Sequence, residues 1–281
     1  MRKPALGLAT ALLLVTGGCS TDSPGRDGGD SPADALGHVH ALGVDPADGT
    51  LYAATHTGVM RVADDGELTR VADRYQDTMA FTVIGPGHFL GSGHPDLQED
   101  LPSHLGLIES TDAAETWEIR SLGGEADFHS LTASGGRTYG YNAIAGELLV
   151  SDDLTTWTRM AQGDVIDLAA EPDAPDTLVA SVPDGTVHRF SGGGDAVQLT
   201  EAPPLLQLAW PSPDALLGVT ATGEIFLSDD AGDTWTQVAE APGTPAAFDA
   251  TEKIWHVATE DGISASEDSG KTWRTILEID H

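Results

Sequence analysis

The chain has 281 residues, of which 45 are acidic and 13 are basic, and its formal net charge is −32. This balance argues against nucleic acid as a partner, because no basic stripe is present to neutralise phosphates, and against docking on anionic lipid headgroups. The single cysteine excludes an intramolecular disulfide and any cysteine-rich zinc or iron–sulfur site. Apolar residues make up 40% of the chain, which is enough for a sizeable core.

The N-terminus has the features of an export signal. Residues 1–18 begin with Arg2 and Lys3, continue with an apolar run too short to span a membrane, and end in small residues. The boundary before Cys19 resembles a bacterial lipobox, which implies lipidation of that cysteine. Residues 19–36 therefore comprise the lipidated cysteine and a flexible tether. We expect an exported protein at the outer face of the bacterial cytoplasmic membrane, or a secreted one, held to the membrane only by its lipid.

A short segment recurs along the rest of the chain with the pattern S-x-D-x-G-x-T-W. Its copies begin at Ser110, Ser151, Ser228 and Ser266, and degenerate copies fit near residues 63 and 191. The six starts are separated by 37 to 47 residues. A fixed period of this length is typical of solenoids, propellers or arrays.

Each period is filled by strands. The first unit contains four short runs with alternating or β-branched residues, HVHALGVDP, TLYAATH, GVMRVA and ELTRVAD, separated by Gly, Asp and Pro turns. Similar quartets begin near Met79, His129, Ile166, Leu206 and Ala247. The sequence therefore predicts an all-β protein, a six-bladed β-propeller of four-stranded blades over residues 37–281.

The recurring segments resemble the Asp-box, or BNR, repeats of sialidases and of propellers similar to the photosystem II assembly factor. The resemblance implies that each box forms the hairpin between the third and fourth strands of a blade, at the periphery. Its serine and aspartate would bond to the turn backbone, its glycine would adopt positive φ, and its tryptophan would be buried between blades. We therefore expect no catalytic role for the box aspartates, which are Asp112, Asp153, Asp230 and Asp268.

Most histidines fall in the first three units, and the innermost strands place them in register. Equivalent positions are held by Leu42, Phe81, Leu131, Leu168 and Leu208. Two residues earlier stand His40, Met79, His129, Ile166 and Leu206, and four residues earlier stand His38, Asp77, Asp127, Asp164 and Pro204. Residues two apart on a strand share a face, so these side chains are expected at the mouth of the central channel. His56 and His94 lie in connections that can reach the same mouth.

This set predicts a transition-metal site, with copper or zinc as the ion. The candidate ligands are His38, His40, His56, His94, His129 and Met79. Imidazole suits zinc and copper, and a thioether adds a preference for cuprous copper. Asp77 and Asp127 would orient the imidazoles from outside. The alternative is that these histidines are solvated loop residues or ordinary strand residues.

The predicted function is a ligand-, metal- or protein-binding module with a histidine-lined channel mouth. A first alternative is a glycosyl hydrolase of the sialidase-like superfamily, which would need three arginines converging on the mouth to hold a carboxylate. A second is an assembly scaffold with no small-ligand site. We expect a monomer whose partner is a protein or a carbohydrate, and the sequence favours binding over catalysis.

Overall fold

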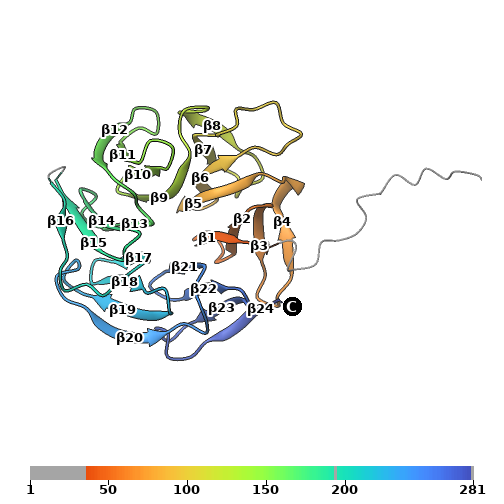
Figure 1. Cartoon of the computed structure of the whole chain (residues 1–281). Helices are drawn as coiled ribbons and strands as arrows, with labels where there is room; N and C mark the ends of the chain where they lie inside the picture. Colours follow the sequence, from red (N-terminus) through yellow and green to blue (C-terminus); the bar gives the residue numbers. More distant parts are fainter. Residues whose placement is uncertain (1–35, 193–194, 280–281) are drawn as a thin grey trace, which may run out of the picture. The chain divides into compact units, whose positions relative to one another are not determined.

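A computed structural model describes residues 36–192 and 195–279, all within the compact unit Ser31–His281. These residues form six antiparallel four-stranded sheets, each built from four consecutive strands and arranged around a central channel (Figure 1). The prediction of a six-bladed β-propeller is confirmed. The export signal and Cys19 lie outside the described residues, and Leu36, at the end of the predicted tether, is fully buried. Within the described part of the chain, no helix has the length and apolar character required to cross a bilayer.

Blades 1 to 3 hold the first twelve strands and are traced in orange to green in Figure 1. Blade 1 contains β1 (Val39–Val44), β2 (Leu51–Thr55), β3 (Gly58–Val62) and β4 (Leu68–Arg70), followed by the short 3₁₀ helix η1 (Val71–Asp73). Blade 2 contains β5 (Asp77–Gly85), β6 (His88–His94), β7 (Leu107–Ser110) and β8 (Glu118–Ser121). Blade 3 contains β9 (Phe128–Ser134), β10 (Arg137–Asn142), β11 (Glu147–Ser151) and β12 (Thr158–Gln162).

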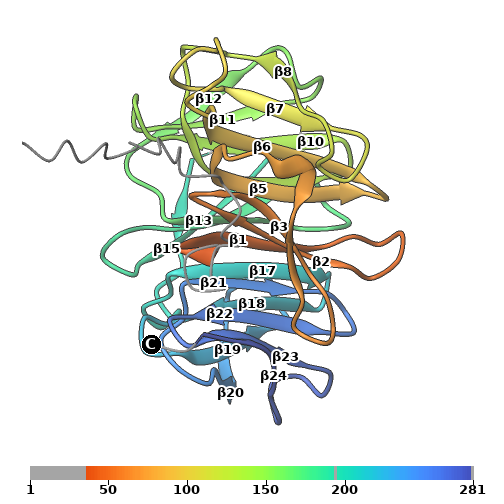
Figure 2. The same cartoon turned by 90° about the vertical axis from the view of Figure 1, so that its right-hand side faces the viewer.

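Blades 4 to 6 complete the ring, which Figure 2 shows from the side. Blade 4 contains β13 (Asp167–Ala170), β14 (Thr177–Ser181), β15 (Val187–Ser191) and β16 (Val197–Gln198). Blade 5 contains β17 (Gln207–Ser212), β18 (Ala215–Val219), β19 (Glu224–Ser228) and β20 (Thr236–Glu240). Blade 6 contains β21 (Ala247–Ala250), β22 (Trp255–Thr259), β23 (Gly262–Ser266) and β24 (Arg274–Glu278). The innermost strand of every blade is its first.

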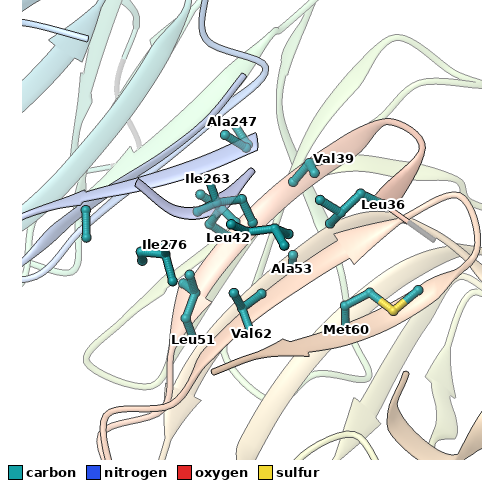
Figure 3. Close-up of a cluster of buried hydrophobic side chains, with 13 residues drawn as sticks. Leu36, Val39, Leu42, Leu51, Ala53, Met60, Val62, Ala247, Ile263 and Ile276 are labelled. Atoms are coloured by element: carbon teal, nitrogen blue, oxygen red, sulfur yellow. The ribbon is translucent and has the colours of Figure 1, made fainter. Parts of the chain in front are cut away.

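The ring is closed by apolar packing between the first and last blades. Leu36, Leu42 and Met60 from the N-terminal side share one buried cluster with Ile263 and Ile276 from blade 6 (Figure 3). Similar clusters fill the other seams between neighbouring blades. Each sheet packs both of its faces against neighbouring blades, so the ring has six small cores, and each core is shared by two blades.

The S-x-D-x-G-x-T-W segments form the turns between third and fourth strands, as predicted. In the turn at Ser228, the serine hydroxyl donates to Asp230 Oδ1 at 2.8 Å and accepts from the Gly232 amide at 2.8 Å. Asp230 also accepts from the amide and hydroxyl of Thr234, at 2.8 and 2.7 Å. Both carboxylate oxygens are therefore used inside the turn, which leaves the aspartate a structural role.

The tryptophans of these segments are less buried than predicted. Trp117, Trp157, Trp235 and Trp273 pack against the seam clusters but are only half-buried. Since the turns lie at the outer edge of the blades, one side of each indole faces solvent. The Nε1–H of Trp273, for example, donates to the Glu240 carbonyl at 2.9 Å.

Candidate metal centre at the channel mouth

The first strand of each blade begins at the end of the channel where the second strand finishes, and we call this end the mouth. The channel is a cavity of about 560 Å³. His40, Met79, His129 and Ile166 line it at the mouth end, as the register of the innermost strands predicts. In blades 1 to 3 the mouth also carries the connections from which the other histidines project.

Between blades 1 and 2, two imidazoles and a carboxylate converge on one point; we call this the blade 1–2 site. His40 comes from β1, His56 from the turn after β2, and Asp77 from the start of β5. Asp77 Oδ1 lies 2.9 Å from His56 Nδ1 and 3.5 Å from His40 Nε2, and the two nitrogens are 3.1 Å apart. Donor atoms of a tetrahedral zinc site with bonds of about 2.0–2.1 Å stand about 3.3 Å apart, so this spacing fits a shared cation.

The environment of His40 keeps its imidazole neutral. Burial, and next the neighbouring positive charge of His56, lower the pKa of His40 to about 4, although the charge of Asp77 acts to raise it. The His40 side chain is only 9% exposed. A neutral imidazole presents the lone pair that a metal ion requires.

Between blades 2 and 3, a second group has the same composition; we call it the blade 2–3 site. It joins His94 at the end of β6, His104 in the β6–β7 loop, and Asp127 just before β9. Asp127 Oδ2 lies 3.7 Å from His94 Nε2 and 3.8 Å from His104 Nδ1. His129 Nε2 lies 3.0 Å from the same oxygen, so three imidazoles surround one carboxylate oxygen.

Polar atoms of the blade 2–3 site are buried without hydrogen-bond partners. His104 Nδ1 and Asp127 Oδ1 are both in this state, which is costly for groups taken out of water. His94 Nδ1 lies 2.8 Å from the Ser103 carbonyl, an acceptor that fixes the proton on Nδ1 and leaves the Nε2 lone pair free. Orphaned donor atoms beside an oriented imidazole are the arrangement expected of a cation site.

Charge within the blade 2–3 site is shared between Asp127 and its imidazoles. Burial acts to raise the pKa of Asp127, but the hydrogen bond from His129 and the positive charges of the three histidines outweigh it, and the pKa is lowered. The same hydrogen bond raises the pKa of His129. Asp127 is therefore a carboxylate whose charge the surrounding imidazoles balance.

Two of the three donors of each site, one histidine and the aspartate, occupy equivalent positions in successive blades, whereas His40 and His104 do not correspond. The equivalent positions Leu42 and Phe81 pair with Ala53 and Gly91 on the second strands. His56 and His94 each stand three residues after these partners, His56 just beyond β2 and His94 at the last position of β6. Asp77 and Asp127 likewise occupy the same place at the start of the next blade. At the following seam the corresponding residues are Ala143 and Asp164, so the histidine is missing there, and Asp164 accepts from the Tyr141 hydroxyl at 3.1 Å.

The structure brings most of the predicted ligands together. His40 and His56 lie in one group, while His94 and His129 lie around Asp127. His38 flanks the blade 1–2 site, with its ring centroid 5.0 Å from that of His40 and 5.8 Å from that of His56.

Two assignments differ from the sequence analysis. Asp77 and Asp127, expected to orient imidazoles from outside, place their oxygens among the donor nitrogens. His104 was not predicted as a ligand, because it lies in a loop outside the strand register. The sign available in the sequence was a second histidine at the far end of the loop that starts at His94.

The described residues that line the channel cavity do not include the arginines that a sialidase-like site would use to hold an anionic sugar. Several arginines pair with acidic side chains elsewhere; Arg74 with Glu99 at 2.9 Å is one such pair. Two acidic side chains do face the cavity, Asp167 and Asp249, and burial raises their pKa values to about 6 and about 7.

Comparison with known proteins supports the fold alone. No protein-family model matches the chain, and no curated protein matches it. Among solved structures, virginiamycin B lyase from Staphylococcus aureus is 13% identical, with a TM-score of 0.58, and the match covers 86% of this chain and 85% of that chain. The gluconolactonase XC5397 from Xanthomonas campestris is 16% identical, with a TM-score of 0.63 over 78% of this chain and 82% of that chain. YCF48 bound to D1 peptide is 15% identical, with a TM-score of 0.51 over 85% and 81%.

Proposed function

We propose that this protein is a transition-metal-binding propeller whose ions are held at the channel mouth by the blade 1–2 and blade 2–3 sites. The observation that carries the proposal is the repeated group of two imidazoles and one carboxylate, with donor atoms within 4.8 Å of one another. Each group supplies three protein ligands, which leaves a coordination position open. Nitrogen and oxygen donors of this kind suit zinc, copper, iron and nickel.

The charge of the chain favours the same function. A net charge of −32 raises the concentration of cations near the surface, whereas it repels anionic ligands until a metal ion is bound. An open position on a bound ion would therefore be the point at which an anionic group of a ligand or partner attaches. We also propose that the protein is exported and anchored by Cys19, which the N-terminal sequence supports. The hydrogen-bonded turns support the further proposal that the propeller is of the Asp-box type.

Zinc titration of the full chain tests the proposal. We expect up to two Zn²⁺ ions per chain by calorimetry and elemental analysis at physiological ionic strength. Asp77→Asn should weaken one site and Asp127→Asn the other, each by at least about tenfold, since even the loss of an outer partner of a metal ligand costs about 10–100-fold.

Asp164→Asn is the matched control. The substitution removes the same charge at the equivalent position of blade 4, where the corresponding residue of blade 3 is Ala143 rather than a histidine. Unchanged zinc affinity in this variant would separate the two sites from general attraction to an acidic surface. Equal loss in all three variants, or no stoichiometric zinc in the wild type, would refute a metal-binding function.

A further inference from the structure

At the mouth end, the innermost strands of blades 1 to 3 continue their pairing past an extra residue, whereas those of blades 4 to 6 begin after the equivalent residue. Each innermost strand of blades 1 to 3 thus carries one extra residue without a cross-strand partner, a β-bulge. In β1 the pairs Val39–Thr55 and Ala41–Ala54 leave His40 out. In β5 the pairs Thr78–Gly93 and Ala80–Ser92 leave Met79 out, and in β9 the pairs Phe128–Asn142 and Ser130–Tyr141 leave His129 out.

The innermost strands of the other three blades begin one position after the bulge and show no register shift at that end. A bulge turns a side chain away from the regular alternation of its strand, and bulges concentrate beside functional sites. Two of the three bulged residues are imidazoles of the proposed metal centre. Met79 is the third, and it lines the mouth together with them.

The repeat defines where Met79 stands relative to the two sites. His40 contacts the carboxylate that begins the next blade, Asp77, at 3.5 Å. His129 contacts the carboxylate that begins its own blade, Asp127, at 3.0 Å. For Met79 the carboxylate of its own blade is Asp77 and that of the next blade is Asp127. By register, the bulged methionine therefore stands between the carboxylates of the two sites.

Packing does not account for Met79. Met60 belongs to the core cluster that closes the ring, and Met160 packs against the cluster between blades 3 and 4. Within the described residues, Met79 belongs to none of the six clusters, and its side chain is half-buried at the mouth. A bulged, half-exposed methionine between two groups of imidazoles is free to offer its sulfur.

We propose that Met79 is a thioether ligand shared by the two sites and that it makes the mouth selective for Cu⁺. This inference rests on the proposed metal-binding function. A thioether is a soft donor that selects Cu⁺, while it adds little for Zn²⁺, whose usual ligands in proteins are imidazole, thiolate and carboxylate. The geometry thus assigns Zn²⁺ to the nitrogen and oxygen donors and Cu⁺ to a set that includes sulfur.

The test compares Cu⁺ and Zn²⁺ binding in the wild-type full chain and in Met79→Leu, which preserves volume and apolar character. Cu⁺, kept reduced with ascorbate, is titrated in competition with bicinchoninate, and Zn²⁺ in competition with a chromogenic zinc chelator. We expect Met79→Leu to weaken Cu⁺ binding at least about tenfold while Zn²⁺ binding stays within about twofold. Met160→Leu is the control and should change neither affinity. X-ray absorption at the copper edge should show copper–sulfur scattering that Met79→Leu abolishes.

The outcomes separate the two proposals. If wild-type protein binds neither ion, the metal-binding function itself fails and this inference fails with it. If zinc binds as expected but Met79→Leu keeps full Cu⁺ affinity, or copper–sulfur scattering persists in that variant, the role of Met79 is refuted and the metal-binding function stands.

Discussion

The carboxylate of Asp167 ties three blades together at the channel wall, and its replacement by asparagine has a calculable effect. Oδ1 accepts from the Ser130 hydroxyl of blade 3 at 3.0 Å and from the Leu168 amide of blade 4 at 2.8 Å. Oδ2 accepts from the Leu208 amide of blade 5 at 2.9 Å. Burial raises the pKa of Asp167 to about 6, although the three hydrogen bonds act to lower it.

Two opposing terms decide the stability of Asp167→Asn. An asparagine that keeps its oxygen at the Oδ1 position turns its amide nitrogen toward the Leu208 N–H, which leaves that donor unsatisfied at a cost of about 1–3 kcal/mol. The variant also avoids burying a charge. Because the folded pKa exceeds the unfolded one, wild-type stability is highest below the unfolded pKa of 3.8 and falls as pH rises toward about 6. Between about pH 4.5 and pH 7.5 this loss amounts to about 2 kcal/mol.

We therefore expect Asp167→Asn to be less stable than wild type at pH 4.5 and nearly equal to it at pH 7.5. Urea unfolding of the full chain at both pH values, with a chelator present, measures the two differences. Asp214→Asn, in the exposed turn between β17 and β18, removes the same charge without burial and is the control. A stability gap for Asp167→Asn that stays constant or widens with pH would show that the buried charge carries no cost.

Two further predictions concern the walls of the ring. Burial, and next the charge of Arg274, lower the pKa of His256 to about 4, so the stability that neutral His256 contributes is lost as pH falls from the unfolded value of 6.5 toward 4. His256→Gln should therefore reduce the acid-induced loss of stability by about 2 kcal/mol between about pH 7 and pH 4.5. An unchanged pH profile of stability, measured by urea unfolding, would contradict this. Gly93 has φ +141°, and a Cβ there would meet the Asp77 carbonyl at 2.0 Å, whereas Gly136 with φ +84° has nothing within 4 Å. Gly93→Ala should therefore lower stability by more than about 1 kcal/mol and weaken zinc binding, while Gly136→Ala bears only the backbone strain, and equal melting temperatures for the two variants would disprove the clash.

Much of this fold could be predicted because its signals are local and repeated. Short apolar runs such as TLYAATH, together with Gly, Asp and Pro between them, indicate short strands, and a period near forty residues indicates a ring of blades. The hairpin boxes were also predictable, since their serine, aspartate and positive-φ residues act within a single turn. The partial exposure of Trp273 and its counterparts was not, because it depends on how far the turn extends beyond the neighbouring blade.

The candidate site was predictable only where it follows the strand register. His40 and His129 could be aligned because they stand two residues before the equivalent leucines. His104 could not, since its approach to Asp127 depends on the path of the loop between β6 and β7. The bulges could not be predicted either, because the alternation of a regular strand would simply place His40 and Leu42 on the same face.

The bulged positions and the residue types that occupy them together explain why a sixfold ring carries its candidate chemistry on one side. All six innermost strands face the same channel, so symmetry alone would offer six equivalent places for ligands. Among the described residues, ladder pairing continues past the extra residue only in blades 1 to 3, at His40, Met79 and His129. The apolar residues two positions later, Leu42, Phe81 and Leu131, belong to the clusters that fill the seams. In blade 4 the residue equivalent to the bulged ones is Ile166, 42% exposed, with no histidine beside it. Local departures from the repeat, rather than the repeat itself, therefore concentrate donor atoms at three adjacent blades, and the more regular blades are left to close the ring.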